Sequence, residues 1–284
     1  MAGLTEKQIA ARAKGVGASE SAIVLGLNEH VSPYQLWLQK TGRIIAEDIS
    51  NLAPVYWGTI HEETIAQEYA KVFNCSVRRV SNTIVHKTKP FILCHIDRKV
   101  EGLAKVLECK FAMRHSDNWG ESGSDVVPLT YIVQVQHQLA CTGYAEGDLA
   151  VLIAGWDFRV YHFKRDEAII ATIETALTDF WHCVETDTPP ALRDKTDASL
   201  AYPLSNGNYI EVDSVSIKEE LEKYICARTS IAELEDQKKK AADQITLFIK
   251  KADGLKSNGK FVATWKPTKN GNRVLRVMER GLHE

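Results

Sequence analysis

Two short apolar segments joined by a tight turn carry three charged residues, and they constrain the fold more than any other part of the chain. The first segment ends at Asp97, and the second carries Glu108 and Lys110. Alternate side chains of a strand share one face, so Glu108 and Lys110 must point to the same side of a sheet. A turn at Glu101-Gly102 would pair the two strands and bring Asp97 beside Glu108.

Two carboxylates and an ammonium group in one small patch have a definite chemistry. Carboxylate oxygens are hard ligands that suit Mg²⁺ or Mn²⁺, and an adjacent lysine can orient a metal-activated water. The apolar neighbours of both segments make unpaired charge costly. A solvated surface pair is the alternative, because Glu and Lys on one strand face often form one. The spacing by itself leaves both interpretations open.

The composition excludes several classes of protein. The 284 residues are 44% hydrophobic, which allows one large domain, or one domain with an appendage. The six cysteines are scattered singly without a CxxC pair, which argues against zinc ribbons and disulfide frameworks. Residues 1–14 are polar rather than signal-like, and no apolar run has the length of a membrane span, so we expect a cytoplasmic protein. A net charge of −2 does not indicate a nucleic-acid binder, but local positive charge in a groove suffices to hold DNA.

The order of the predicted elements indicates an α/β fold with a mixed central sheet flanked by helices. Residues 1–195 form the predicted core domain, and residues 196–214 read as a linker. The predicted helices cover residues 20–25, 33–42, 59–73, 129–142 and 167–186, and the predicted strands cover 76–80, 84–86, 91–97, 106–111, 148–154 and 157–163.

Residues 215–284 are predicted to form a basic C-terminal appendage. A capping box at Ser216-x-x-Glu219 begins a long polar helix, and Asn270-Gly271 indicates a β-hairpin after it. From Lys238 to Arg280 there are 12 Lys/Arg and 3 Asp/Glu. This basic segment could contact DNA phosphates, and a solvated helix face is an equally good interpretation.

Further polar residues fit a site near the hairpin. Gly58 precedes a predicted helix, and Glu62 falls in its first turn, where the helix dipole favours a carboxylate for structural reasons alone. Gln134 and Gln138 share one face of the predicted helix 129–142, at spacing i, i+4. Amides in such an apolar helix indicate a polar site, and an ordinary amphipathic polar face is the alternative.

The segment from Arg12 to Ser19 contains a glycine-rich turn before a predicted helix. Backbone N–H groups at a helix start, the hydroxyl of Ser19 and the guanidinium of Arg12 together suit a phosphate group. Ser19 is also a good N-cap, which is the purely structural interpretation.

Taken in order, these segments resemble the YqaJ-type viral recombinase nucleases, relatives of lambda exonuclease in the PD-(D/E)XK superfamily. The resemblance covers roughly residues 10–190 and rests on a combination of motifs. The motifs are Gly15-Val16-Gly17-Ala18-Ser19-Glu20, Ser32-Pro33-Tyr34-Gln35-Leu36-Trp37, Gly58-Thr59-Ile60-His61-Glu62, Asp97, Glu108-Cys109-Lys110 and residues 131–138. The superfamily proline is replaced by Ile96, at a position that supplies no ligand, and the role of His95 stays open.

The resemblance implies a role for each residue of the predicted hairpin. Asp97 and Glu108 would ligate two Mg²⁺ ions, with Mn²⁺ as a substitute, and the backbone carbonyl of Cys109 would be a further ligand. Lys110 would position or activate the attacking water. The implied fold is the restriction-endonuclease-like PD-(D/E)XK core, followed here by the C-terminal helix and hairpin.

The resemblance also implies roles for the residues outside the hairpin. Glu62 and Gln134 would complete the site by holding a metal-bound water or Lys110, with Glu62 acting on the metal directly or through water. Arg12 and Ser19 would recognise the 5′-phosphate of a DNA end.

The implied activity is 5′→3′ degradation of one strand of duplex DNA by a phage or prophage enzyme. The 3′ overhang would pass to a single-strand annealing protein, and the enzyme would assemble as a homo-oligomeric ring, commonly a trimer. The alternatives are a PD-(D/E)XK endonuclease of restriction or repair type, and an inactive scaffold that binds DNA ends.

Overall fold

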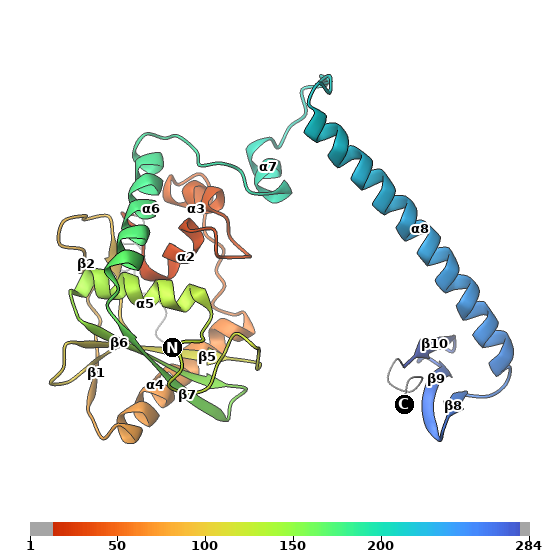
Figure 1. Ribbon diagram of the computed structural model, residues 1–284, viewed down its shortest axis with the longest axis horizontal. Helices are drawn as coiled ribbons and strands as arrows, with labels where there is room; N and C mark the ends of the chain where they lie inside the picture. Colours follow the sequence, from red (N-terminus) through yellow and green to blue (C-terminus); the bar gives the residue numbers. More distant parts are fainter. Residues whose placement is uncertain (1–13, 279–284) are drawn as a thin grey trace. The chain divides into compact units, whose positions relative to one another are not determined.

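The computed structural model describes residues 14–278 and consists of two units, Met1–Ser205 and Asn206–Glu284 (Figure 1). The first unit holds a five-stranded sheet in the order β1-β4-β5-β6-β7. Its strands are β1 (Val77–Arg79), β4 (Arg98–Val100), β5 (Lys105–Ala112), β6 (Glu146–Ile153) and β7 (Asp157–Lys164). In the part of the chain that is described, no helix is long and apolar enough to span a membrane.

Helices cover both faces of this sheet. They are η1 (Ala18–Glu20), α2 (Ser21–Val24), α3 (Pro33–Lys40), α4 (Ala53–Val72), α5 (Leu129–Thr142), α6 (Glu167–Glu185) and α7 (Lys195–Ala201). Strands β5 and β6 run parallel, which requires a crossover connection, and α5 supplies it. The other strand pairs of the sheet are antiparallel. The predicted mixed sheet flanked by helices is confirmed.

The alternation of side chains along β5 separates two cores. Val106 packs with Val133 and Leu139 of α5, in a core that also includes α3 and α6. Leu107, together with Cys109, packs on the opposite face against α4. Glu108 and Lys110 therefore belong to the α5 face, as the period of two predicts.

The prediction of one continuous strand over residues 91–97 is wrong, because this segment pairs with different parts of the chain along its length. Leu93–Cys94 forms β3, which pairs with β2 (Ile84–Val85) in a separate two-stranded sheet. Ile92 forms a parallel bridge with Val16. The chain then bends, and only from Arg98 does it pair with β5. Asp97 thus lies immediately before β4 rather than within a strand.

The helix predicted to start at Thr59 starts six residues earlier, at Ala53. Pro54 lies in its first turn, where a proline costs no hydrogen bond. Glu62 is therefore in the middle of α4 and not in its first turn. The dipole at the N-terminus of α4 therefore does not explain why a carboxylate lies at position 62.

The predicted linker 196–214 is partly folded. Residues Lys195–Ala201 form α7, and Asp197 is fully buried. Its carboxylate accepts hydrogen bonds from Ser32 Oγ at 2.6 Å and from the Arg193 amide at 2.8 Å. The first unit consequently extends to Ser205 rather than ending at residue 195, and only the stretch after α7 lacks regular structure before α8.

The second unit consists of the long helix α8 (Val215–Ile249) and a three-stranded antiparallel sheet. The strands are β8 (Gly254–Ser257), β9 (Lys260–Pro267) and β10 (Arg273–Val277), in the order β10-β9-β8. The hairpin at Asn270-Gly271 is confirmed, with Gly271 at φ 84°. The predicted capping box is wrong, because Ser214 is the N-cap and Ser216 lies inside α8.

Candidate active site

Asp97 lies where β5 has an unpaired edge. Antiparallel pairing with β4 ends at Arg98↔Leu107, so the edge of β5 beyond Leu107 is open on this side. Asp97 Oδ2 accepts a hydrogen bond from the Cys109 amide at 2.9 Å. The N–H and C=O groups of one strand residue point to the same edge, so the Cys109 carbonyl faces this region as well. The backbone geometry fits the ligand role expected for that carbonyl.

Glu108 is almost fully buried and is held by three donors. Gln134 Nε2 donates to its Oε1 at 2.5 Å, and Gln138 Nε2 donates to its Oε2 at 2.6 Å. The two amides lie one helical turn apart on α5, so they grip both oxygens of the carboxylate. Lys110 Nζ lies 2.6 Å from Glu108 Oε1. The structure thus brings Asp97, Glu108, Lys110 and Gln134 together.

Proximity and burial change the ionisation of this cluster. Burial, followed by the charge of Glu108, raises the pKa of Asp97 to about 8. Burial lowers the pKa of Lys110, but the carboxylates of Glu108 and Asp97 raise it by more, and the net shift is upward. Lys110 is therefore an ammonium group at neutral pH, while Asp97 retains its proton more strongly than an ordinary carboxyl group does.

Glu62 is held by Arg98, a residue that the sequence does not identify as functional. The Arg98 guanidinium donates to Glu62 Oε1 at 2.6 Å, to the Asp97 carbonyl at 2.7 Å and to Glu63 Oε2 at 2.8 Å. The Arg98 side chain is only 3% exposed. A buried charge next to Asp97 fixes that residue's backbone and holds α4 against the sheet.

A cleft opens between the N-terminal half of α4, the end of β5 and the start of α5. It has a volume of about 400 Å³. The residues that line this catalytic cleft are Pro54, Val55, Gly58, Thr59, Glu62, Asp97, Cys109, Lys110, Phe111 and Tyr131. It gives a substrate access to the groups at the open edge of β5.

The donor set of the cleft fits a divalent cation. Asp97 and Glu108 supply hard carboxylate oxygens, and the Cys109 carbonyl faces the same edge. The raised pKa of Asp97 shows that a cation would relieve an unfavourable negative charge. Among the described residues, no three His, Cys, Asp or Glu side chains form a metal-binding group. Arg98 holds Oε1 of Glu62, and Glu62 also lines the cleft, so this carboxylate could act on a metal ion directly or through water.

Only part of the predicted phosphate site lies within the described residues. Arg12 lies outside the described residues. Ser19 is exposed within η1 and is not an N-cap, because Gly17 precedes η1 and its amide donates to the Glu20 carboxylate at 2.8 Å. Ser21 Oγ contacts His137 Nδ1 at 2.5 Å, which joins this segment to α5. The structure leaves the Ser19 hydroxyl accessible to solvent.

Gln138 and His95 lie near the carboxylates and support them through hydrogen bonds, roles that the sequence indicates only in part. Gln138, part of the amide-rich helix, is fully buried, and its Oε1 is the one buried side-chain polar atom without a partner among the described residues. The His95 imidazole contacts Thr83 Oγ1 at 2.9 Å, while its carbonyl accepts from Gln138 Nε2 at 3.2 Å. His95 therefore contributes its backbone to the support of the site.

Comparison with known proteins identifies the family of this chain. The model of the YqaJ-like viral recombinase domain matches residues 9–145. The chain is 34% identical to the uncharacterized protein YqaJ of Bacillus subtilis (strain 168) over 273 residues, which are 93% of this chain and 83% of the relative.

Solved structures show the same fold. The alkaline exonuclease LHK-Exo of Laribacter hongkongensis matches with a TM-score of 0.51 and 24% identity, over 65% of this chain and 94% of that chain. Its complex with dAMP matches with the same TM-score and coverage and 26% identity. The chain therefore has the fold of an alkaline exonuclease and belongs to the YqaJ-like viral recombinase family.

Proposed function

We propose that this protein is a Mg²⁺-dependent exonuclease that degrades duplex DNA from its ends in the 5′→3′ direction and leaves 3′ overhangs. One observation carries the proposal: Asp97 and Lys110 line a cleft of about 400 Å³ at the open edge of β5, and the buried Glu108 carboxylate lies 2.6 Å from Lys110 Nζ. Mn²⁺ is expected to substitute for Mg²⁺.

Each group of the cleft has a separate task in this reaction. Asp97, Glu108 and the Cys109 carbonyl would hold the metal ions, two in the proposed active state. Bound Mg²⁺ supplies electrostatic stabilisation of the phosphoryl oxygens and a more acidic water. Lys110 stays protonated beside the carboxylates, so it donates a hydrogen bond that orients water or stabilises developing phosphate charge. Gln134 and Gln138 fix the Glu108 carboxylate in place.

The relatives favour an exonuclease over an endonuclease. LHK-Exo is an alkaline exonuclease, and its complex with dAMP contains a mononucleotide. A mononucleotide has the size that end-wise degradation releases. A scaffold without activity would not need a lysine and two carboxylates packed at a cleft, because burying these charges is costly.

The direction of degradation can be tested with end-labelled duplex. Linear DNA labelled at either the 5′ or the 3′ end of one strand is incubated with protein and Mg²⁺. The proposal predicts early release of the 5′ label as mononucleotide, with the 3′ label retained on progressively shorter strands. Early release of the 3′ label would contradict the proposed polarity.

The 5′-phosphate should affect degradation through Ser19. A hydrogen bond to a charged group contributes about 1.5–3 kcal/mol, so we expect Ser19→Ala to raise KM on 5′-phosphorylated duplex by about tenfold or more. The variant should change KM little on duplex that lacks the phosphate. Ser81→Ala, at an exposed serine outside the cleft, is the control. Equal effects of Ser19→Ala on both substrates would reject this role.

Metal binding should depend on pH through Asp97. Its raised pKa of about 8 means that the folded protein keeps a proton there which a cation must displace. Mg²⁺ affinity should therefore rise by up to about tenfold per pH unit between about pH 6 and pH 8, and level off above. Isothermal titration of Mg²⁺ without DNA measures this directly. The slope should vanish in Asp97→Asn, and a wild-type affinity independent of pH would contradict the assignment.

The proposal includes two kinds of partner. A 3′ overhang needs a protein that covers it, so we propose a single-strand annealing protein as the functional partner. We also propose a homo-oligomeric ring, with a trimer favoured, since enclosing the duplex would let one enzyme remove many nucleotides per encounter. Light scattering and product-length analysis of the full chain test the ring and its processivity.

A further inference from the structure

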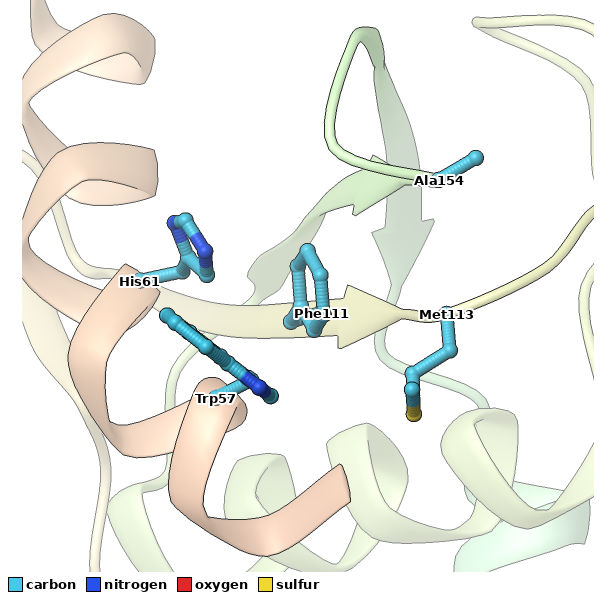
Figure 2. A pocket seen from close by; sticks show the side chains of 5 residues that line it. All are labelled: Trp57, His61, Phe111, Met113 and Ala154. Carbon is cyan, nitrogen blue, oxygen red and sulfur yellow. The ribbon is translucent and has the colours of Figure 1, made fainter. Parts of the chain in front are cut away.

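A second hollow lies beside the catalytic cleft and has a different chemical character. It has a volume of about 280 Å³. We call it the aromatic pocket, and it is lined by Trp57, His61, Phe111, Met113 and Ala154. Figure 2 shows Trp57 and His61 projecting from α4 toward Phe111 of β5, with Met113 and Ala154 on the other side. None of these five side chains is an acid, a lysine or an arginine.

The rings of the pocket form an ordered stack. Phe111 and His61 lie with ring centroids 4.5 Å apart and an interplanar angle of 19°. His61 and Trp57 follow at 5.8 Å and 29°. At the end of this stack, Trp57 is 43% exposed, and Met113 across the hollow is 48% exposed. An accessible stack of flat rings next to a polarizable thioether suits a flat, aromatic ligand.

The aromatic pocket adjoins the catalytic cleft. Phe111 lines both, and it directly follows Lys110 along β5. Helix α4 likewise presents Gly58 and Glu62 to the cleft while Trp57 and His61 line the pocket. Two residues of a strand span roughly 7 Å, so the pocket begins about one nucleotide's reach from the Cys109 backbone.

We propose that the aromatic pocket binds an unstacked nucleobase of the strand whose phosphodiester lies in the catalytic cleft. This inference rests on the proposed function, because it takes a DNA strand as the ligand of the cleft. The stack would receive the face of the base, while the cleft receives the phosphate. Because every base has a π-face and the pocket offers few hydrogen-bonding groups, binding would be tolerant of sequence.

Binding measurements with modified DNA test the pocket. The protein is the full chain carrying Lys110→Ala in Mg²⁺, and the probe is a 5′-phosphorylated linear duplex with one abasic nucleotide moved through the first positions of the 5′ strand. At one position the missing base should weaken binding by about tenfold or more. A 2-aminopurine at that position should change its fluorescence on binding, because it leaves the base stack of the duplex for the rings of the pocket.

Two substitutions connect this effect to the pocket. Adding Trp57→Ala or Phe111→Leu should abolish the fluorescence change and make intact and abasic DNA bind equally. Trp57 is well exposed, and leucine at position 111 keeps most of the packing volume, so the fold should survive both changes. Ile60→Ala is the matched control, since Ile60 is an exposed α4 residue outside both linings, and it should keep both effects.

The outcomes separate this inference from the proposed function. The absence of any base-dependent position, or a base effect that survives both pocket variants, would overturn the inference. A changed oligomeric state in Trp57→Ala without loss of a base effect would also overturn it and identify a protein interface instead. Wild-type degradation of linear duplex is measured in parallel. If degradation proceeds while the base effect is missing, only the pocket proposal fails; if wild type neither binds nor degrades DNA, the proposed function fails as well.

Discussion

Replacing Lys110 with alanine is expected to slow the degradation of linear duplex by about 10³-fold, the cost typical of losing one preorganised charged donor. The Lys110 ammonium lies 2.6 Å from Glu108 Oε1 and lines the catalytic cleft. Its loss removes the positive charge that orients water or stabilises the phosphate. Glu108 would still be held by Gln134 and Gln138, so the cleft should keep its shape.

The measurement is the initial rate of nucleotide release under saturating Mg²⁺, with DNA affinity measured on the same preparation. Affinity should change little, because phosphate contacts along a groove share the binding energy. Lys87→Ala removes the same charge at an exposed site and should leave the rate unchanged. Undiminished degradation by Lys110→Ala would show that the chemistry takes place elsewhere.

Replacing Arg98 with methionine is expected to lower the free energy of unfolding by about 3 kcal/mol, because it removes hydrogen bonds between charged groups that contribute about 1.5–3 kcal/mol each. Arg98 is 3% exposed at its side chain and holds Glu62, Glu63 and the Asp97 carbonyl. Methionine fills much of the same volume but leaves Glu62 with only the more distant Arg79, whose guanidinium lies 3.8 Å from Glu62 Oε1. For a domain of this size the melting temperature should fall by about 10 °C.

Two further variants identify the cause of that loss. Arg78→Met breaks an exposed ion pair with Glu101, and it should cost less than about 1 kcal/mol. Adding Glu62→Gln to Arg98→Met should recover part of the stability, since it removes a carboxylate that has lost its hydrogen bond to Arg98. A melting temperature of Arg98→Met equal to that of Arg78→Met would contradict the structural role assigned to Arg98.

The parts of the site that depend on local periodicity could be predicted from the sequence. The period of two along β5 correctly places Glu108 and Lys110 on one face. The i, i+4 spacing on α5 correctly places Gln134 and Gln138 together, and both amides donate to Glu108. Gly143 ends α5 in a left-handed conformation, as a terminal glycine predicts.

The parts that depend on contacts distant in sequence could not be predicted. Arg98 is functional only because α4 packs on the sheet and presents Glu62 and Glu63 to it, and no local pattern encodes that contact. The sequence predicts a start of this helix after Gly58 because glycine resembles a helix boundary, although a glycine inside a helix costs only about 1 kcal/mol. A Cβ at Gly58 would meet no atom within 4 Å, so this glycine leaves open space on the wall of the cleft.

The change of strand partner before Asp97 has the same origin. The apolar residues 91–97 have the composition of one strand, but Ile92 and Leu93 bond with Val16 and β2 instead of with β5. Asp97 is left at a bend, where its carboxylate turns to the Cys109 amide. The charge of Glu108 nevertheless raises the pKa of Asp97, which agrees with the predicted proximity of the two residues.

The central claim is that the cluster at the open edge of β5 hydrolyses DNA from its ends. The most direct measurement compares linear duplex with covalently closed circular DNA of the same sequence, in Mg²⁺, for wild type and Lys110→Ala. The account predicts that wild type converts linear duplex to mononucleotides and leaves the closed circle intact, while Lys110→Ala degrades neither. Cleavage of the closed circle by wild type would indicate an endonuclease, and intact linear DNA with wild type would contradict the assignment of a DNA exonuclease.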